Sequence, residues 1–314
     1  MPTLTSLRNV RELPRLLHST DGLLISFWCL LSLISIIFNS RIPGWWLIVL
    51  ADFAACSMAS ALALCAKSGG SRVLQWVHDW AAFPLVVFTY KQVYFMISPI
   101  HQGKDYDEVL LALDRWLLRG HSIEWLAGLA NPWLTEALQI AYSLFYVFFI
   151  AVGLELYRKK DLSSFRYFRF TVVYGFFLSY AAYFFMPAVG PRFALFDFSR
   201  IDTDLPGLSL TPALRWFVNI FESIPSGASN TVALASAQRD VFPSGHTMMT
   251  VVAILMAYRY KLRVRHWVFG VGMMLIFSTV YLRYHYFVDL LAGAFLVLPC
   301  ILTSNKVYRL LGSR

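Results

Sequence analysis

The chain has 314 residues, of which 58% are hydrophobic and only 14% carry a charge. A soluble domain of this size needs more charge to cover its surface, so the composition excludes an ordinary soluble protein and favours a polytopic membrane protein. The net charge of +9 comes from short basic clusters between apolar segments, which is typical of membrane anchoring rather than of nucleic-acid binding. The four cysteines lie in apolar segments without metal-binding spacing, and we expect no metal or other cofactor.

Apolar segments follow one another along the chain, and most approach the ~20 residues that a helix needs to cross a bilayer. We therefore predict an all-α, polytopic membrane helical bundle with about eight spans. These are residues 22–38, 43–66, 80–100, 133–156, 168–186, 243–260, 266–283 and 285–303. The third span contains Pro84 and Lys91, and a charge at this depth either serves a function or reaches back to the interface.

Two connections are long enough to form structure of their own. The apolar positions of Asp107–Arg119 follow helical spacing, which predicts a short helix lying in the membrane interface. Residues 187–242 are rich in Pro, Gly, Ser and Asp, with a short helix predicted at Thr211–Glu222. A connection of this length supplies a lid or a substrate-binding wall over an active site, or serves as a tether.

The distribution of Lys and Arg predicts the orientation of the bundle. More of these residues fall on the side of the two chain ends than on the opposite side, which places both termini in the cytoplasm. The same topology places Arg192, residues 243–246, Arg283, His285 and Asp289 together on the non-cytoplasmic face. These groups are dispersed over about 100 residues of sequence and would not often fall on one side by chance. Their placement on the same face therefore supports a shared site.

The segment Pro243-Ser244-Gly245-His246 has the composition of a helix start. Pro243 suits a first helical turn, where its missing N–H costs nothing. Ser244 and Gly245 then present a hydroxyl and unhindered N–H groups at the positive end of the helix dipole, which is a binding site for a phosphate. The alternative is an ordinary helix cap.

Two histidines and an aspartate complete a constellation for phosphoryl transfer. His285 is the candidate nucleophile, because an imidazole nitrogen that attacks phosphorus divides one displacement into two easier steps. Asp289 follows one helical turn later, where its carboxylate would bind the other ring nitrogen. His246 is the candidate general acid for the leaving alcohol. A structural Asp–His pair between helices is the alternative, but it leaves the second histidine unexplained.

The phosphoryl oxygens need cationic partners as charge develops on them. Arg192 ends the rigid segment Pro187–Arg192, and Arg283 lies two residues before His285. Lys91 and Arg239 are further candidates. Each of these side chains would otherwise extend toward lipid headgroups.

Two motifs carry a family resemblance. Phe242–Thr247 (FPSGHT) and Thr279–Gly293 (TVYLRYHYFVDLLAG) resemble the second and third signature motifs of the type 2 phosphatidic acid phosphatase and haloperoxidase superfamily. Tyr106–Trp116 (YDEVLLALDRW) and Pro187–Arg192 are similar to the branch of inositol phosphorylceramide synthases and their bacterial relatives. The resemblance covers about residues 75–305.

This resemblance implies a metal-independent phosphatase or phosphotransferase with a six-helix catalytic core, acting on lipid phosphates at the outer or lumenal leaflet. It implies His246 as the acid, His285 as the nucleophile and Asp289 as its support, with phosphate held by Ser244 and Gly245. Phe185 and Thr279 stand where the superfamily has a lysine and an arginine. Arg283, Lys91 or Arg239 would then supply the missing charge.

We therefore expect residues 1–74 to form a cytoplasmic segment and two spans, residues 75–305 the catalytic domain, and residues 306–314 a cytoplasmic tail. Head-group transfer between lipids, as in inositol phosphorylceramide synthases, is the first hypothesis. Hydrolysis of phosphatidic acid or of polyprenyl or phosphatidylglycerol phosphate is the second.

A lipid transporter is the rival of another class, but ionisable residues gather at one face and no repeat is present. A serine protease with Ser244 as nucleophile lacks its sequence context. The partners expected are membrane lipids. The absence of an N-x-S/T sequon favours a bacterial inner membrane, with the site facing the periplasm. The oligomeric state is left open.

Overall fold

The computed structural model describes residues 17–67 and 71–312, and every regular element within them is helical. The all-α prediction is therefore confirmed for the described part of the chain. Three arginines at the start, Arg8, Arg11 and Arg15, and one at the end, Arg314, contributed to the predicted orientation and lie outside the described residues.

Long helices occupy all of the predicted spans. The fourth span is a bent pair, α6 and α7, with a change of direction of 50°. The long helices are α2 (Ser19–Ile37), α3 (Trp45–Lys67), α4 (Arg72–Ile100), α6 (Pro132–Ser143), α7 (Phe145–Arg158), α8 (Leu162–Tyr183), α13 (Gly245–Arg259), α14 (Arg265–Tyr281) and α15 (Phe287–Leu311).

Four of these helices, α2, α3, α4 and α15, are long and apolar enough to cross a membrane, and a fifth span results if the bent pair is counted as one. The chain is thus an integral membrane protein. The predicted number of eight spans is not established. α13 and α14 have only 15 and 17 residues, fewer than the ~20 that a bilayer requires, and α8, with 22 residues, is not among the helices that are apolar enough. Both nevertheless pack against the long helices, α13 on α8 and α15, and α14 on α13.

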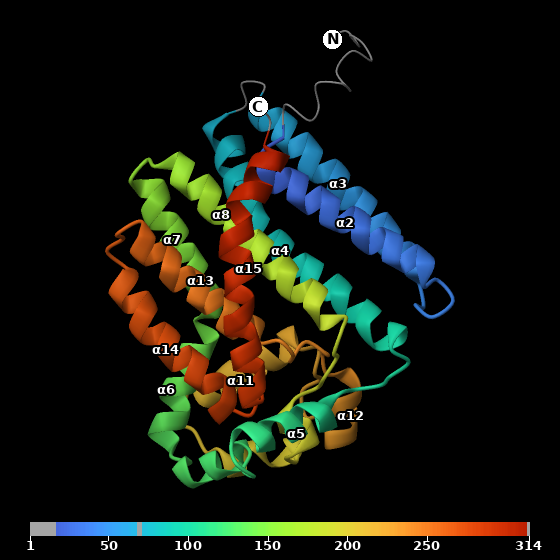
Figure 1. Cartoon of the computed structure of the whole chain (residues 1–314), viewed down its shortest axis with the longest axis vertical. Coiled ribbons are helices and arrows are strands. Elements are labelled where there is room, and N and C mark those ends of the chain that lie inside the picture. The colour runs from blue at the N-terminus through green and yellow to red at the C-terminus, as the bar shows by residue number, and fades with distance from the viewer. Residues whose placement is uncertain (1–16, 68–70, 313–314) are drawn as a thin grey trace.

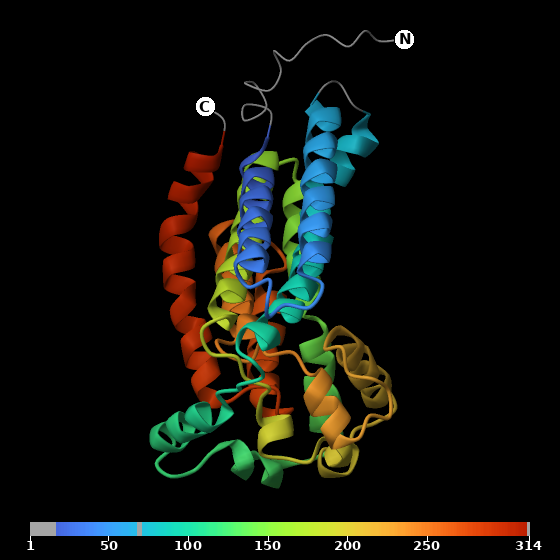
Figure 2. The same cartoon turned by 90° about the vertical axis from the view of Figure 1, so that its right-hand side faces the viewer.

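The long helices form one bundle, and short helices collect at one of its ends (Figures 1 and 2). The predicted helices at 107–119 and 211–222 are confirmed as α5 and α11. The short elements are α5 (Asp107–Leu117), η2 (Ile123–Leu129), α9 (Pro191–Ala194), η3 (Phe198–Arg200), α10 (Ile201–Asp204), α11 (Thr211–Phe221) and α12 (Asn230–Ser236). α5 leaves Val109, Leu113 and Trp116 exposed, as a helix in the interface would.

The start of α2 and the end of α15 lie together at the other end of the bundle (Figure 1). The hydroxyl of Ser19 donates a hydrogen bond to the carbonyl of Tyr308 over 2.8 Å. The described ends of the chain therefore share one side, opposite α5 and α11, as the charge distribution predicts. The assignment of that side to the cytoplasm stays a prediction.

Glycines allow the helices that carry the predicted site to approach closely. A Cβ atom on Gly293 of α15 would overlap the carbonyl oxygen of Ser244, which caps α13. A Cβ on Gly175 of α8 would meet the Met249 side chain of α13 about as closely. Small residues at these crossings bring backbones together. The packing thus places the start of α13 directly against the start of α15.

Candidate active site

His246 lies in the first turn of α13, and the cap of this helix differs from the prediction. The helix begins at Gly245, and Ser244 is its N-cap, with the hydroxyl oxygen accepting from the N–H of Thr247 over 3.2 Å. Pro243 therefore precedes the cap and is not in the first turn. The reason is that a serine N-cap takes extended backbone angles, which places the preceding proline outside the helix. The first N–H groups of α13 still point out of the helix.

The structure brings the two predicted catalytic histidines together. The ring centroids of His246 and His285 lie 5.7 Å apart, although 39 residues separate them in sequence. His246 stacks on Tyr142 at 4.7 Å between centroids and touches the ring of Phe145 at 4.5 Å. These aromatic rings restrict the imidazole of His246 and shield it from water. A small group between the two imidazoles would contact both.

His285 lies in the turn between α14 and α15, and two oxygens face its Nδ1. The carbonyl oxygen of Val241 is 2.9 Å away, and Oδ2 of Asp289 is 3.4 Å away. Asp289 is thus at the ring nitrogen where the sequence predicts it, but the carbonyl of Val241 is the nearer acceptor. A proton on Nδ1 satisfies both oxygens and leaves the lone pair on Nε2. Burial lowers the pKa of His285 to about 4, so the ring is neutral at neutral pH.

Asp289 has a second function at the start of α15. Its Oδ2 accepts the N–H of Tyr286 over 2.7 Å, so the carboxylate caps the helix. Among the described residues, no group donates a hydrogen bond to its Oδ1, and the side chain is fully buried. A buried carboxylate in this position supports positive charge on the neighbouring imidazole.

Arg192 lies close enough to His285 for its charge to act on that imidazole. Its charge is among the causes that lower the pKa of His285. Its Nη2 lies 3.0 Å from Oε2 of Glu222, and its guanidinium stacks 4.8 Å from the ring of Tyr284. Its backbone N–H donates to the carbonyl of Arg283 over 2.9 Å. The Nε of Arg192 has no partner among the described residues, so a donor remains for a ligand.

Gly190 allows the segment Pro187–Arg192 to pass close to the turn that carries His285. Its φ of 91° lies in the left-handed region, and a Cβ there would stand 2.7 Å from the carbonyl oxygen of Tyr284. Only glycine fits such a close passage of two backbones. The segment Pro187–Arg192 is therefore built to lie against the turn that carries His285.

The other predicted cations have carboxylate or carbonyl partners in the structure. Nη1 of Arg283 lies 2.9 Å from Asp204, and Nε of Arg239 lies 3.2 Å from Asp105. The ammonium of Lys91 donates to the carbonyl of Phe221 and, over 2.9 Å, to the hydroxyl of Ser223. A phosphate-binding role for these three residues stays a prediction, and for both arginines it requires an ion pair to open.

Two carboxylates of α5 position the site, and the sequence analysis missed both. Asp107 accepts the N–H groups of Val189 and Gly190 over 3.0 and 2.8 Å. Asp114 accepts those of Phe287 and Val288 at the start of α15 over 3.0 and 2.7 Å. The signal was present, because the two acids stand seven residues apart, two turns along one helical face. They tie α5 to both segments that flank His285.

Loss of the Asp114 carboxylate is expected to loosen the start of α15. In Asp114→Ala two backbone N–H groups lose their acceptor, which costs about 1–3 kcal/mol in the free energy of unfolding. Thermal unfolding in detergent should show the loss, with Asp114→Asn intermediate because one acceptor oxygen remains. Glu108→Ala, at an exposed position of the same helix, is the matched control. Equal melting temperatures for Asp114→Ala and the control would contradict the capping role.

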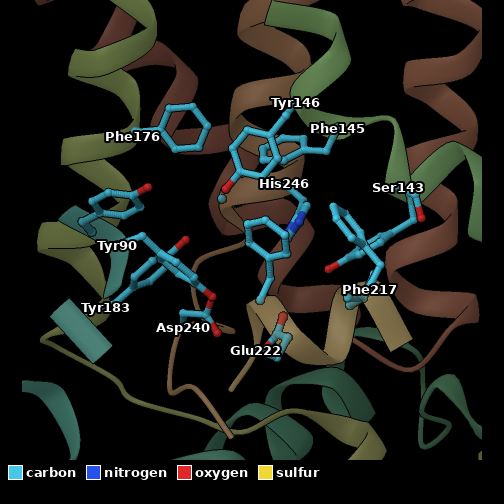
Figure 3. Close-up of a pocket in the computed structure, with 15 residues that line it drawn as sticks. Tyr90, Ser143, Phe145, Tyr146, Phe176, Tyr183, Phe217, Glu222, Asp240 and His246 are labelled. Atoms are coloured by element: carbon cyan, nitrogen blue, oxygen red, sulfur yellow. The ribbon is translucent and has the colours of Figure 1, made fainter. Parts of the chain in front are cut away.

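A cavity of about 70 Å³ lies beside His246, and Figure 3 shows its lining. The 187–242 connection forms part of its wall, since α11 contributes Phe217, Val218 and Phe221, whereas substrate binding by this wall stays a prediction. Gly245 and His246 line the cavity from α13. Two carboxylates that the sequence analysis did not single out, Glu222 and Asp240, also face it.

A possible metal-ligand cluster lies elsewhere in the molecule. His18, Asp21 and His78 bring ligand atoms within 4.8 Å of one another, the single such group within residues 17–67 and 71–312. These residues belong to the starts of α2 and α4, at the end of the bundle opposite α11. Nη2 of Arg169 lies 3.3 Å from Nδ1 of His18 and would repel a bound cation. The cluster is best described as a buried polar network between helices.

A comparison with known protein families identifies one match, and it covers the part of the chain that holds the candidate active site. The model of the PAP2 superfamily matches residues 108–303, more than half of the chain. The matched region includes both histidines, Asp289, Arg192 and the wall formed by α11. Searches of curated proteins and of solved structures return no match. The match extends over both signature motifs and the segment between them, and the chain belongs to the PAP2 superfamily.

Proposed function

We propose that the protein transfers a phosphoryl-containing group from a lipid phosphoester to an alcohol, through a phosphohistidine intermediate on His285. The observation that carries this proposal is the pairing of His246 and His285 at 5.7 Å, with Nδ1 of His285 held by oxygens. Membership of the PAP2 superfamily supports an enzyme of lipid phosphoester chemistry. The direction of transfer and the head group belong to the proposal.

The first step forms a bond between Nε2 of His285 and phosphorus, and breaks the bond from phosphorus to the leaving oxygen. The electron pair of that bond goes to the oxygen, which takes a proton from protonated His246. The imidazole of His285 becomes positively charged, and Asp289 at 3.4 Å together with the carbonyl of Val241 stabilises this charge. No metal takes part in the proposed step.

The phosphoryl oxygens are held by cationic and N–H donors. Arg192 supplies its guanidinium, including the free Nε, once its contact with Glu222 opens. The first N–H groups of α13, at Gly245 and beyond, form the positive end of the helix dipole. Ser244 closes the same turn as its cap. These donors stabilise negative charge that spreads over the non-bridging oxygens.

The second step reverses the first with a new alcohol. Neutral His246 takes the proton of the acceptor hydroxyl, whose oxygen attacks phosphorus. The bond between phosphorus and Nε2 breaks, and its electron pair returns to His285. Aromatic rings surround His246 and restrict water, which favours an alcohol over hydrolysis. A lipid phosphatase is the second candidate, because about 70 Å³ exceeds the ~10–15 Å³ that one water requires.

The cellular setting is part of the same proposal. α5 leaves apolar side chains exposed at the end of the bundle that holds the site, where a lipid headgroup would arrive. We place this end at the periplasmic face of a bacterial inner membrane and residues 75–305 in the catalytic domain. Inositol phosphorylceramide synthase-like transfer, with a sphingolipid acceptor, is one form of the reaction.

A lipid assay by mass spectrometry tests the choice between transfer and hydrolysis. Purified protein would receive phosphatidic acid, phosphatidylinositol, phosphatidylglycerol, phosphatidylcholine or phosphatidylethanolamine, each with and without ceramide or diacylglycerol. We expect a new phospholipid only when an acceptor is present. Release of the phosphate group without an acceptor would establish the phosphatase instead. Absence of both from folded protein, over all these lipids, would contradict phosphoester chemistry and favour a transporter.

A further inference from the structure

The cavity beside His246 carries more negative charge than a site for phosphate alone should have. Glu222 and Asp240 both line it, and they face the rings of Phe145, Tyr146 and Phe176 (Figure 3). Asp240 accepts a hydrogen bond from the hydroxyl of Tyr90 over 2.6 Å. Two carboxylates repel an anion, and the proposed phosphoryl transfer uses neither of them. Their presence requires another explanation.

Most of the other residues that line the cavity are aromatic. Carboxylates combined with ring faces are the chemistry that binds an alkylammonium group, because ring quadrupoles and anionic oxygens both attract a desolvated cation. The hydroxyls of the lining tyrosines would also hydrogen-bond an uncharged polyol, but a polyol brings no positive charge to the two carboxylates. The walls are formed by Tyr90, Phe145, Tyr146, Phe176, Tyr183 and Phe217.

The charges around the cavity are balanced before a substrate arrives. Arg192 lies 3.0 Å from Glu222, and Lys91 contributes a second positive charge beside Glu222 and Asp240. The hydrogen bonds of Lys91 go to a carbonyl and a hydroxyl, so its positive charge is not paired with a single carboxylate. When Arg192 turns to a phosphate, Glu222 loses its closest partner. An unpaired buried carboxylate is costly unless a new cation replaces the old one.

The electrostatics of Glu222 agree with this exchange of partners. Burial raises the pKa of Glu222 to about 7, although Arg192 acts to lower it. Removal of the arginine from this carboxylate would raise its pKa further. A substrate that carries both a phosphate and an ammonium supplies an anion to Arg192 and a cation to Glu222 in the same event. A purely anionic substrate supplies only the first.

We propose that this cavity binds the ammonium of an amino-alcohol phosphoester, so that the substrate of the enzyme is zwitterionic, of the choline or ethanolamine type. The inference rests on the proposed function, because the phosphorus has to reach His285 while the ammonium lies beside His246. Glu222 and Asp240 are specificity residues for the head group. Inositol and glycerol headgroups lack the charge that this cavity matches.

The test compares head groups in one assay. Turnover that depends on His285 would be measured for phosphatidylcholine and phosphatidylethanolamine against phosphatidylglycerol, with the same acceptor. In wild-type protein we expect kcat/KM at least about tenfold higher for the zwitterionic lipids, a difference equivalent to one favourable ammonium contact. Glu222→Gln should reduce this preference about tenfold, measured within the variant as the ratio of kcat/KM for a zwitterionic lipid to kcat/KM for phosphatidylglycerol. Asp240→Asn should act in the same direction.

Controls separate the two proposals. Glu124→Gln, at an exposed carboxylate on the same end of the molecule, should leave the preference unchanged. Equal turnover of all three lipids, with no effect of Glu222→Gln, would overturn the ammonium site while leaving the proposed function intact. If no lipid is turned over, calorimetric titration with soluble phosphocholine decides. Binding by wild type that weakens in Glu222→Gln supports the site, and absence of binding by wild type overturns it.

Discussion

Replacement of His285 by asparagine is expected to abolish phosphoryl transfer while the protein stays folded. The asparagine amide retains an N–H donor near the position of Nδ1, so the hydrogen bond to the carbonyl of Val241 is kept. It removes Nε2, the nitrogen that attacks phosphorus. Loss of a covalent nucleophile removes the two-step route, and we expect turnover to fall at least ~10³-fold. The measurement is initial velocity on the donor lipid identified by mass spectrometry.

His121→Asn provides the matched control, since His121 is an exposed histidine at the same end of the molecule. It should retain full activity. A donor with a radioactive phosphate would label wild-type protein through an acid-labile bond, and His285→Asn should take up no label. Retained turnover in His285→Asn, with a wild-type melting temperature, would remove His285 from its assigned role and with it the covalent mechanism.

The second large effect is expected from His246, and it should depend on the leaving group. His246→Gln removes the proton donor, so esters of poorly acidic alcohols should lose about 10²–10⁴-fold in kcat/KM. Nitrophenyl esters leave without protonation and should lose far less. Glutamine is preferred to alanine here because the imidazole packs between Tyr142 and Phe145, and a smaller side chain would open a cavity.

A series of substituted phenyl phosphoesters would give the dependence of rate on leaving-group acidity. The slope should steepen in His246→Gln compared with wild type. A loss of the same size on every ester would show that His246 positions the substrate rather than protonating it. His246→Gln should also keep the ability to form the acid-labile intermediate from nitrophenyl esters, which His285→Asn should lack.

The apolar spans and the motifs could be predicted from the sequence because they depend on local chemistry. Continuous apolar stretches form helices in lipid whatever their neighbours are, since each backbone group must be satisfied within its own segment. The position of α5 followed from helical periodicity in the same way. The number of spans did not follow, because α13 and α14 are too short by themselves and take their place only through packing.

Within the candidate site, the residues that could be predicted from the sequence are those with a distinctive chemistry: His246, His285, Asp289 and Arg192. The sequence did not show which of the predicted cations are held in ion pairs, because that depends on the partners that each one meets in the folded protein. Arg283 meets Asp204 and Arg239 meets Asp105, pairs that lie far apart in sequence.

Three features were decided by tertiary structure alone. The nearest partner of His285 is the carbonyl of Val241, and a backbone group leaves no signature in a sequence. Asp107 and Asp114 act on backbone N–H groups more than 80 residues away along the chain. Glu222 and Asp240 face a wall of aromatic rings because α11 and the loop before α13 meet α4, α7 and α8 around one cavity. Sequence determined which groups are available for chemistry, whereas long-range packing determined which of them meet.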